Sequence, residues 1–337
     1  MSDRATMRAV VLDGFGGPEV LRPGEVPRPR PGLGQVLIRV AATSVNRADL
    51  QQRSGNYAPP PGESEILGLE VAGVIEQLGE GVSGWRVGDR VMTLVGGGGY
   101  AEHATAAAST LMPVPDGIDL VQAAGIAEVF ITAWLNVFRE AALKPGETLL
   151  AHGGASGVGT AAIQLAKALG PSPVIVTVGS EAKAEACRKL GADHVILYKQ
   201  EDFSERALAL ADGRGPDVIL DHIGAAYLEP NLRCLAAYGR LVIIGLLGGA
   251  KAELNIGRLM VKRQRVIGSV LRARPVAEKA EITAAFRAAA LDRFARGELK
   301  PVIHAVLPLA EVRRAHELVA ANANTGKVIL QVDPSLQ

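Results

Sequence analysis

Apolar residues follow two different patterns along the chain, and the change between them falls near residue 126. In the first part, short runs in which apolar and polar positions alternate are separated by turns rich in Gly and Pro, as expected of β-strands. The predicted strands comprise 7–15, 35–45, 71–79, 89–95 and 99–106. Their even spacing, with Pro-rich connections at 23–31 and 59–61, predicts a compact, barrel-like all-β domain.

From residue 128 onward, strands and helices alternate. Apolar residues at helical spacing predict a helix over 128–140. Continuous runs rich in β-branched residues then predict strands at 147–153, 173–180, 193–198, 217–224, 239–247 and 265–271, with amphipathic segments that begin near residues 157, 181, 204 and 227. Such strands, separated by helices, form a parallel sheet that is buried on both faces. We therefore expect a doubly wound Rossmann domain over 127–271.

The last part of the chain mixes both patterns. It predicts a helix over 276–296, a Pro-flanked strand over 302–308, a helix over 309–321 and a final strand over 327–332. We expect this segment to return to the first domain. The predicted organisation is α/β, with 1–126 and 272–337 in the all-β domain and 127–271 in the parallel-sheet domain.

The loop after the first parallel strand reads Gly154-x-Ser156-x-x-Gly159. This is the spacing of a dinucleotide-binding fingerprint with Ser in place of the middle Gly. Gly154 permits the tight turn, a small residue at 156 lets the backbone approach a pyrophosphate, and Gly159 lets the helix pack close to the sheet. The helix start at Gly157 and Val158 offers the anion unpaired N–H groups and the positive end of the helix dipole.

The end of the second parallel strand decides which dinucleotide fits. An Asp or Glu there hydrogen-bonds the ribose 2′-hydroxyl of NAD, but this strand ends in Gly179 and Ser180, which leave room for a 2′-phosphate. Lys183 could neutralise that phosphate with a charge-assisted bond of about 1.5–3 kcal/mol, which favours NADP(H). In the alternative, Glu181 binds the ribose and Lys183 is a solvated helix residue. Tyr198, at the end of the third strand, either covers the adenosine or is a surface aromatic residue.

Composition and charge narrow the class of protein. Lys and Arg number 36 and Asp and Glu 35, a net charge of +1, which offers no broad field for nucleic acid or an anionic membrane. Cys187 and Cys234 form no CxxC motif, so we expect neither a disulfide framework nor a thiolate zinc site, and we expect a cytoplasmic location. Residues 1–14 do not predict a signal peptide, and 118–138 falls short of a membrane span.

Four segments resemble the zinc-free quinone oxidoreductases of the medium-chain dehydrogenase/reductase superfamily. They are SVNRADLQQRSGNYAPPPG, ILGLEVAGVIEQLGEGV, HGGASGVGTAAIQLAKALG and ANTGKVIL. The resemblance covers nearly the whole chain and is greatest to the p53-inducible subgroup, which shares the Ser at position 156. It implies a GroES-like catalytic domain in addition to the Rossmann domain, dependence on NADPH, a homodimer and no metal.

The residues agree with the absence of a catalytic metal. Zinc alcohol dehydrogenases of this superfamily have a Cys before the first helix, a position that falls in Asn46-Arg47-Ala48-Asp49 of this chain, and a Gly-His-Glu where it has Gly68-Leu69-Glu70. The four-cysteine lobe is absent, and no pair of the six histidines has the spacing of metal ligands. Without a Lewis acid to stabilise an alkoxide, alcohol oxidation is not expected.

The resemblance also implies which residues meet the cofactor and the acceptor. It assigns the 2′-phosphate to Gly179, Ser180 and Lys183, and the adenosine to Tyr198. It assigns the nicotinamide half to Gly245, Leu246, Leu247, Val270, Leu271 and Arg272. It sets Asn46, Tyr57 and Thr132 in the cleft beside the reactive ring, and it makes Asn322 a further cofactor position.

A quinone is flat and electrophilic and accepts a hydride without a metal, so the protein has chiefly to hold it against the nicotinamide. We expect Tyr57, Asn46 and Ser156 to place the quinone. The Tyr57 phenol could donate to the developing oxyanion, a contact worth roughly 2.7–4 kcal/mol when it is well placed. From the residues alone, Tyr57 is more simply a loop tyrosine packed on proline, and Asn46 a residue that fixes a turn.

Three other polar residues have structural alternatives. Asp49 either orients its loop or pairs with Arg53 four residues on. His152 and His222, at predicted strand ends, are expected to be structural.

Two alternative functions and one assembly remain open from the sequence. The chain could be an NADPH-dependent reductase of enoyl or alkenal C=C bonds, with Tyr57 as proton donor. It could also be a non-catalytic RNA-binding or structural relative, which only the basic run over 258–274 supports and the low aromatic content of 4% opposes. If the weakly charged strand over 239–247 is the edge of the sheet, it predicts a homodimer with a continuous sheet.

Overall fold

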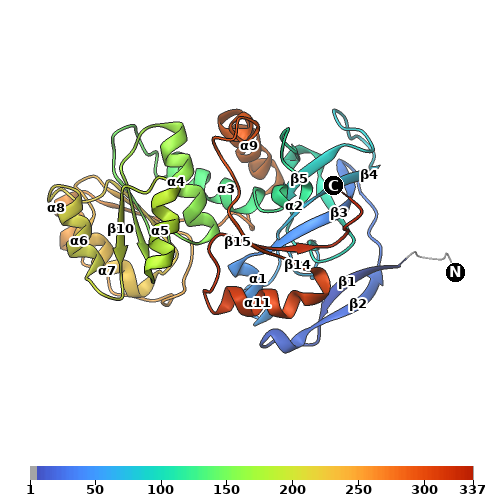
Figure 1. The fold of residues 1–337 in the computed structure, drawn as a ribbon, viewed down its shortest axis with the longest axis horizontal. Helices are drawn as coiled ribbons and strands as arrows, with labels where there is room; N and C mark the ends of the chain where they lie inside the picture. Colours follow the sequence, from blue (N-terminus) through green and yellow to red (C-terminus); the bar gives the residue numbers. More distant parts are fainter. Residues whose placement is uncertain (1–5, 337) are drawn as a thin grey trace. The chain divides into compact units, whose positions relative to one another are not determined.

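The computed structural model describes residues 6–336, which divide into two compact units (Figure 1). Unit 1 comprises the chain up to Ile131 and from Leu271 onward, and unit 2 comprises Thr132–Val270. The sequence pattern placed these boundaries at 126/127 and 271/272. Residues 1–5, part of the stretch in which no signal peptide was expected, lie outside the described residues. Over residues 6–336, no helix is long and apolar enough to cross a membrane.

Unit 1 is built on a seven-stranded sheet. Its neighbouring strands follow the order β14 (Ile303–Pro308), β15 (Lys327–Gln331), β3 (Gln35–Val45), β4 (Glu70–Leu78), β5 (Arg90–Leu94) and β7 (Met112–Pro113), and β6 (His103–Ala107) also pairs with β3. β1 (Thr6–Leu12) and β2 (Leu21–Pro27) form a separate antiparallel pair. Because β15 pairs with β3, the last part of the chain joins the sheet formed by the first.

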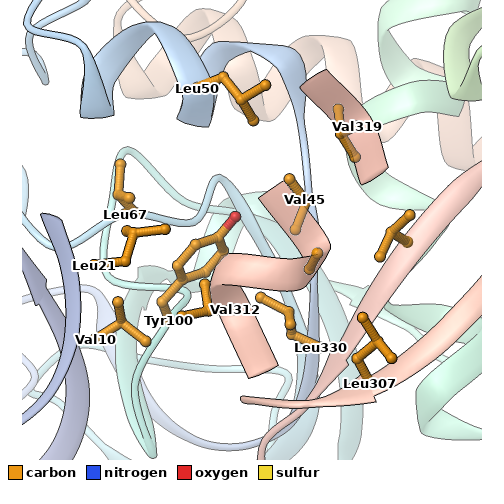
Figure 2. Packing of buried hydrophobic residues seen from close by; sticks show 12 residues of the cluster. Val10, Leu21, Val45, Leu50, Leu67, Tyr100, Leu307, Val312, Val319 and Leu330 are labelled. Atoms are coloured by element: carbon orange, nitrogen blue, oxygen red, sulfur yellow. The ribbon is translucent and has the colours of Figure 1, made fainter. Parts of the chain in front are cut away.

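Short helices connect the strands of unit 1. They are η1 (Pro18–Val20), α1 (Arg47–Arg53), η2 (Ala108–Thr110), α2 (Leu120–Ala123), α9 (Val276–Phe286), η4 (Arg287–Leu291), α10 (Asp292–Ala295), η5 (Leu309–Glu311) and α11 (Val312–Ala320). The single helix expected over 276–296 is therefore α9 and α10 joined by a π-helical stretch, η4. Apolar side chains from β1, β2, α1, α11 and β15 pack around the fully buried Tyr100 (Figure 2).

Unit 2 contains the parallel sheet that the continuous apolar runs predict. Its strands lie in the order β10 (His194–Leu197), β9 (Val174–Val178), β8 (Leu149–Ala151), β11 (Val218–Asp221), β12 (Arg240–Ile243) and β13 (Arg265–Gly268). In chain order this is 3-2-1-4-5-6, the order of the doubly wound dinucleotide-binding fold. The α/β class, with an all-β domain and a doubly wound Rossmann domain, is confirmed.

Along the chain, the helices of unit 2 alternate with these strands. They are α4 (Gly157–Leu169), α5 (Glu181–Lys189), α6 (Phe203–Leu210), α7 (Ala225–Cys234) and α8 (Ile256–Lys262). The helix expected over 128–140 consists of α3 (Ala127–Trp134), which begins in unit 1, followed by η3 (Leu135–Glu140), a π-helical segment. Periodicity over so short a stretch does not separate a π-turn from an α-helix, so the sequence missed it.

The condition attached to the strand over 239–247 is not met, because this strand is not the edge of its sheet. The apolar run over 239–247 forms β12, which lies between β11 and β13. β13 is the edge strand at that end of the sheet, and its Val266 side chain is exposed.

Several cations of the basic run over 258–274 are engaged within the protein, whereas Arg263 and Arg265 are exposed. Arg258 pairs with Glu229 at 3.1 Å, and Arg274 pairs with Glu278 at 2.5 Å. The Lys262 ammonium donates to the backbone carbonyl oxygens of Arg233 and Leu235 at 3.0 and 2.9 Å. These contacts reduce the number of free cations that the run could present to a nucleic acid.

Candidate functional site

The glycine loop of unit 2 is packed so tightly that side chains are excluded at two of its positions. A Cβ added at Gly154 would lie 2.5 Å from Val176 Cβ, and one at Gly159 would lie 2.3 Å from the carbonyl oxygen of Gly153. Ser156 is the N-cap of α4, and its hydroxyl oxygen accepts a hydrogen bond from the Gly159 N–H at 3.0 Å. Because that oxygen serves as the acceptor, the hydroxyl hydrogen of Ser156 is directed elsewhere and can donate.

The ends of β9 and β10 lie next to each other, as the parallel sheet requires. A Cβ at Gly179 would lie 2.9 Å from the Tyr198 hydroxyl oxygen, so Gly179 and Tyr198 are in close contact. Ser180 is the N-cap of α5, and Lys183 lies in the first turn of that helix. The Tyr198 side chain remains 42% exposed. This edge of the sheet thus presents glycine backbone, a hydroxyl, an ammonium group and an aromatic ring, without an Asp or Glu at the strand end.

The loops that follow β12 and β13 carry apolar residues assigned to the nicotinamide half. Leu246, Leu247 and Val270 are exposed. A Cβ at Gly245 would lie 2.9 Å from the carbonyl oxygen of His222, so this loop passes close to the end of β11.

Thr132, at the end of α3 that belongs to unit 2, has a buried hydroxyl. The residue is 8% exposed, and its Oγ1 atom has no hydrogen-bond partner among the described residues. Asn136, one turn later in the π-helical η3, donates to the Thr132 carbonyl oxygen at 2.8 Å, whereas its own Oδ1 also lacks a partner within residues 6–336. Buried polar atoms of this kind are costly unless something satisfies them. The family resemblance pointed to Thr132, whereas nothing in the sequence pointed to Asn136.

The N-terminus of α1 in unit 1 is held by a capping box. The Asn46 backbone N–H donates to Asp49 Oδ2 at 2.7 Å, and the Asp49 N–H donates to the Asn46 backbone carbonyl oxygen at 3.0 Å. Asp49 Oδ1 accepts from the Gly68 N–H at 3.0 Å, and burial raises the pKa of this carboxyl to about 6. Asp49 therefore orients the loop. The alternative pairing with Arg53 is wrong, because the Arg53 guanidinium contacts the Gly16 carbonyl and His316.

A buried polar network fixes the amide of Asn46. Glu70 is fully buried, and its Oε1 lies 3.0 Å from the Lys327 ammonium, 2.5 Å from the Ser44 hydroxyl and 3.1 Å from Asn46 Nδ2. Lys327 also donates to Asn46 Oδ1 at 2.5 Å, and Glu70 Oε2 accepts the Glu128 N–H at 2.8 Å. The Asn46 oxygen and nitrogen are thus both engaged by charged partners. Sequence reasoning missed Lys327, although it lies in the GKVIL segment that carries the family resemblance.

The Tyr57 ring lies against a buried arginine of the same unit. The Arg272 guanidinium carbon is 5.1 Å from the centre of the Tyr57 ring. Partial burial raises the pKa of the Tyr57 phenol, and the nearby Arg272 charge opposes part of that rise. The phenol is therefore protonated at neutral pH and can donate a hydrogen bond.

Asn322, expected as a cofactor position, is held by Arg47. Arg47 donates to Asn322 Oδ1 at 2.5 Å and to the Val319 carbonyl oxygen at 2.8 Å. Asn322 has a φ of +52°, in the left-handed region that Asn tolerates better than most residues.

The prediction that His152 is structural is confirmed. His152 is fully buried between the Thr177 hydroxyl at 3.0 Å and Asn231 Oδ1 at 2.7 Å, and burial lowers its pKa to about 3. Cys187 and Cys234 are buried and unpaired, and burial raises the pKa values of their thiols to about 11 and about 12. None of these groups is suited to act as a base or nucleophile at neutral pH.

The donor atoms at the position of the superfamily's catalytic metal do not fit zinc. The stretch Asn46-Arg47-Ala48-Asp49, in which the Cys of the zinc enzymes falls, contains no Cys, and Leu69 stands in place of their His; the Glu70 carboxylate is engaged by the Lys327 ammonium. Among residues 6–336, no group of three His, Cys, Asp or Glu side chains is placed to hold a metal ion.

Comparison with known proteins identifies the class of this protein and then its family. Residues 32–116 match the alcohol dehydrogenase GroES-like domain, and residues 157–290 match the zinc-binding dehydrogenase family. Together they define a medium-chain dehydrogenase/reductase. The chain is 37% identical to a quinone oxidoreductase of Pseudomonas aeruginosa over 94% of its own length and 97% of that protein. It therefore belongs to the quinone oxidoreductase family of this superfamily.

Two further relatives widen the comparison. A 2-haloacrylate reductase of a Burkholderia species is 33% identical over 96% of this chain and 98% of that protein. The crystal structure of Escherichia coli quinone oxidoreductase complexed with NADPH has a TM-score of 0.86 at 30% identity, and the match covers 97% of this chain and 100% of that one.

Proposed function

We propose that the protein is an NADPH-dependent quinone oxidoreductase that works without a metal. The observation that carries the proposal is the set of groups at Asn46, Leu69 and Glu70, in which an amide, an apolar side chain and an engaged carboxylate replace metal ligands. A quinone suits such a site because its conjugated carbonyl groups accept a hydride without a Lewis acid. The quinone oxidoreductase relatives support the same choice of acceptor.

Unit 2 has the features that NADPH requires. The backbone at Gly154 and Gly159 has no room for side chains, as the tight turn and the close helix–sheet packing of a dinucleotide-binding loop demand. Ser180 and Lys183 lie at the start of α5, just after β9, where a 2′-phosphate is expected, and Tyr198 offers an exposed ring to the adenosine. The buried Thr132 hydroxyl, which lacks a partner among the described residues, suits a polar group of the nicotinamide. When bound, NADPH supplies the hydride.

Unit 1 supplies the polar groups for the acceptor. The Tyr57 phenol, protonated at neutral pH, donates a hydrogen bond to the quinone oxygen on which negative charge develops. The Asn46 amide is fixed by Lys327 and Glu70, so it provides a rigid polar group in the proposed acceptor site. A quinone that has taken the hydride is a hydroquinone monoanion, and its charged oxygen then needs one proton, which solvent supplies.

Stopped-flow oxidation of NADPH by 1,2- and 1,4-quinones tests this proposal. Tyr57→Phe should lower kcat by about 10²–10³, the effect of removing one well-placed oxyanion donor. Tyr238→Phe is the matched control, because Tyr238 is an exposed tyrosine of unit 2 that contacts Arg263. Tight NADPH binding without turnover of any quinone would count against the proposal.

A second candidate, reduction of an activated C=C bond, is favoured by the relative that reduces a 2-haloacrylate. In that reaction the hydride adds to one carbon of the double bond, and the Tyr57 phenol would deliver the proton to the other. Turnover of 2-chloroacrylate or a crotonyl thioester at a rate above that of the quinones would select this function.

We further propose that the protein is a cytoplasmic homodimer. The edge strand β13 exposes Val266, and the preceding helix α8 exposes Met260 and Val261. An unpaired edge with apolar neighbours favours pairing with an identical strand of a second copy. Light scattering at micromolar concentration should give twice the mass of the chain, and Val266→Lys should lower it; a monomeric wild type would refute the dimer.

A further inference from the structure

We propose that Arg272 is a positioning residue for Tyr57: its guanidinium holds the phenol ring and ties the Tyr57 loop to the loop after β5. The inference rests on the proposed function, because it assigns a role in that reaction to a side chain that does not itself touch the acceptor. It involves only residues of unit 1.

The contacts of Arg272 are those of a buried strut. The residue is 8% exposed. Its Nε and one terminal nitrogen donate to the Gly96 carbonyl oxygen at 2.8 and 2.6 Å, and that nitrogen also donates to Gln52 Oε1 at 2.7 Å. The other terminal nitrogen lies 3.5 Å from the Tyr57 carbonyl oxygen. One guanidinium therefore joins α1, the Gly96 loop and the Tyr57 loop.

The backbone around Gly96, whose carbonyl oxygen accepts from Arg272, is closely packed. A Cβ at Gly96 would lie 2.1 Å from the Glu63 side chain, and one at Gly97 would lie 2.1 Å from the Ser64 carbonyl oxygen. The segment around Glu63 and Ser64 thus packs directly on the glycine run that receives Arg272. Since this segment follows the Tyr57 loop in the chain, both ends of that loop are restrained.

The guanidinium also acts on the phenol through its charge. With its carbon 5.1 Å from the ring centre, it lies within the range of a cation–π contact. Its charge opposes the rise in the pKa of Tyr57 that burial causes, and a more acidic phenol is a stronger hydrogen-bond donor. Arg272 thereby fixes the position of the donor and strengthens it.

This role differs from the one that family resemblance assigns to position 272. There the residue borders the nicotinamide half of the cofactor. A guanidinium that bound the cofactor would affect the KM for NADPH. A guanidinium that positions Tyr57 would instead affect kcat/KM for the quinone, because the phenol donates to the quinone oxygen.

A double-mutant cycle separates the two roles. In steady-state assays with 9,10-phenanthrenequinone, Arg272→Met should lower kcat/KM for the quinone about tenfold, equivalent to about 1.4 kcal/mol. The KM for NADPH should stay within about twofold. In a Tyr57→Phe background the same substitution should add less than about twofold, because the group through which it acts is gone. Equal losses in both backgrounds, or a larger change in the KM for NADPH, would overturn the inference.

A spectroscopic measurement makes the test independent of turnover. Of the five tyrosines, Tyr57 can be assigned in protein labelled with ¹³Cζ-tyrosine by its loss in Tyr57→Phe. Its phenol pKa should rise in Arg272→Met and change less in Arg272→Lys, which keeps the charge but loses the planar fork. Arg240→Met is the matched control, since Arg240, in unit 2, is half-buried and its guanidinium is likewise engaged, by the Ala141 carbonyl oxygen at 2.8 Å and by Glu147. It should leave the Tyr57 pKa unchanged.

The outcomes distinguish this inference from the proposed function. If the wild type turns over no quinone, the proposed function fails. The role of Arg272 is then tested by the Tyr57 pKa alone, and an unchanged pKa in Arg272→Met would refute it. If Arg272→Met does not fold, Gln52→Leu removes the acceptor at 2.7 Å and should lower quinone turnover only when Tyr57 is present. A loss that is the same without Tyr57 would refute the inference.

Discussion

Replacing Lys327 with Met tests the buried network that fixes Asn46. The substitution removes an ammonium group 3.0 Å from a fully buried carboxylate while keeping most of the apolar stem. At this distance, with an effective dielectric constant of about 20, the Coulomb attraction is about 5 kcal/mol. Breaking a buried ion pair on one side costs about 3–5 kcal/mol, because the remaining charge stays buried. Glu70 keeps bonds to Ser44, Asn46 and the Glu128 N–H, so we expect about 3 kcal/mol.

Thermal unfolding followed by circular dichroism measures this loss. A cost of about 3 kcal/mol corresponds to roughly 6–12 °C in the Tm of a unit of this size. The control is Lys189→Met, which breaks an exposed Lys–Glu pair with Glu185 at 3.5 Å and should shift the Tm by less than about 3 °C. The double variant Glu70→Gln/Lys327→Met should recover at least half of the loss, since no charge is left unpaired. A Tm for Lys327→Met within about 2 °C of wild type, or a double variant no more stable than the single one, would refute the reasoning.

Three other predictions concern the cofactor and pH. Lys183→Ala should raise the KM for NADPH about ten- to hundredfold and that for NADH far less, and equal effects would reject a contact with the 2′-phosphate. Gly159→Ala should abolish NADPH binding measured by calorimetry and should also lower the Tm, because its Cβ would displace the Gly153 carbonyl; unchanged affinity would contradict this. Burial lowers the pKa of His316 to about 3. The unfolded chain therefore binds a proton below pH 6.5 that the folded one refuses, and stability falls as the pH drops from 6.5 toward 3, by up to about 1.4 kcal/mol per unit. We expect His316→Gln to reduce the dependence of the unfolding free energy on pH, measured by urea titration, by the contribution of one proton. An unchanged dependence would contradict the lowered pKa of His316.

The sequence predicted the elements whose evidence is local. The strand at 35–45 has the predicted bounds, and α4 and α5 begin at Gly157 and Glu181, as the glycine and polar residues before them indicate. Strand ends were less accurate: the run at 217–224 yields a strand only over Val218–Asp221. There the Asp221 carboxylate accepts the Ile223 and Gly224 N–H groups and turns the chain, although the apolar pattern continues.

The contacts that build the candidate site were not local and could not be read from the pattern. Lys327 and Glu70 lie far apart in the chain and meet only because β15 pairs with β3 beside β4. Arg272 belongs to a run of cations that is typical of a solvated face, and only the fold shows that it is buried. The Thr132 hydroxyl oxygen has no hydrogen-bond partner among the described residues. Its environment is set by the packing around η3, and the π-helical turn there left no signature in the sequence.

The pairing of β15 with β3 has a consequence for synthesis on the ribosome. The sheet of unit 1 receives β14 and β15 only after the whole of Thr132–Val270 has been translated. Unit 2 is continuous in sequence and can fold while the earlier strands wait with an uncovered edge on β3. During that interval the nascent chain exposes apolar strand surface, so its yield should depend on chaperones and fall when translation of the final segment is slowed.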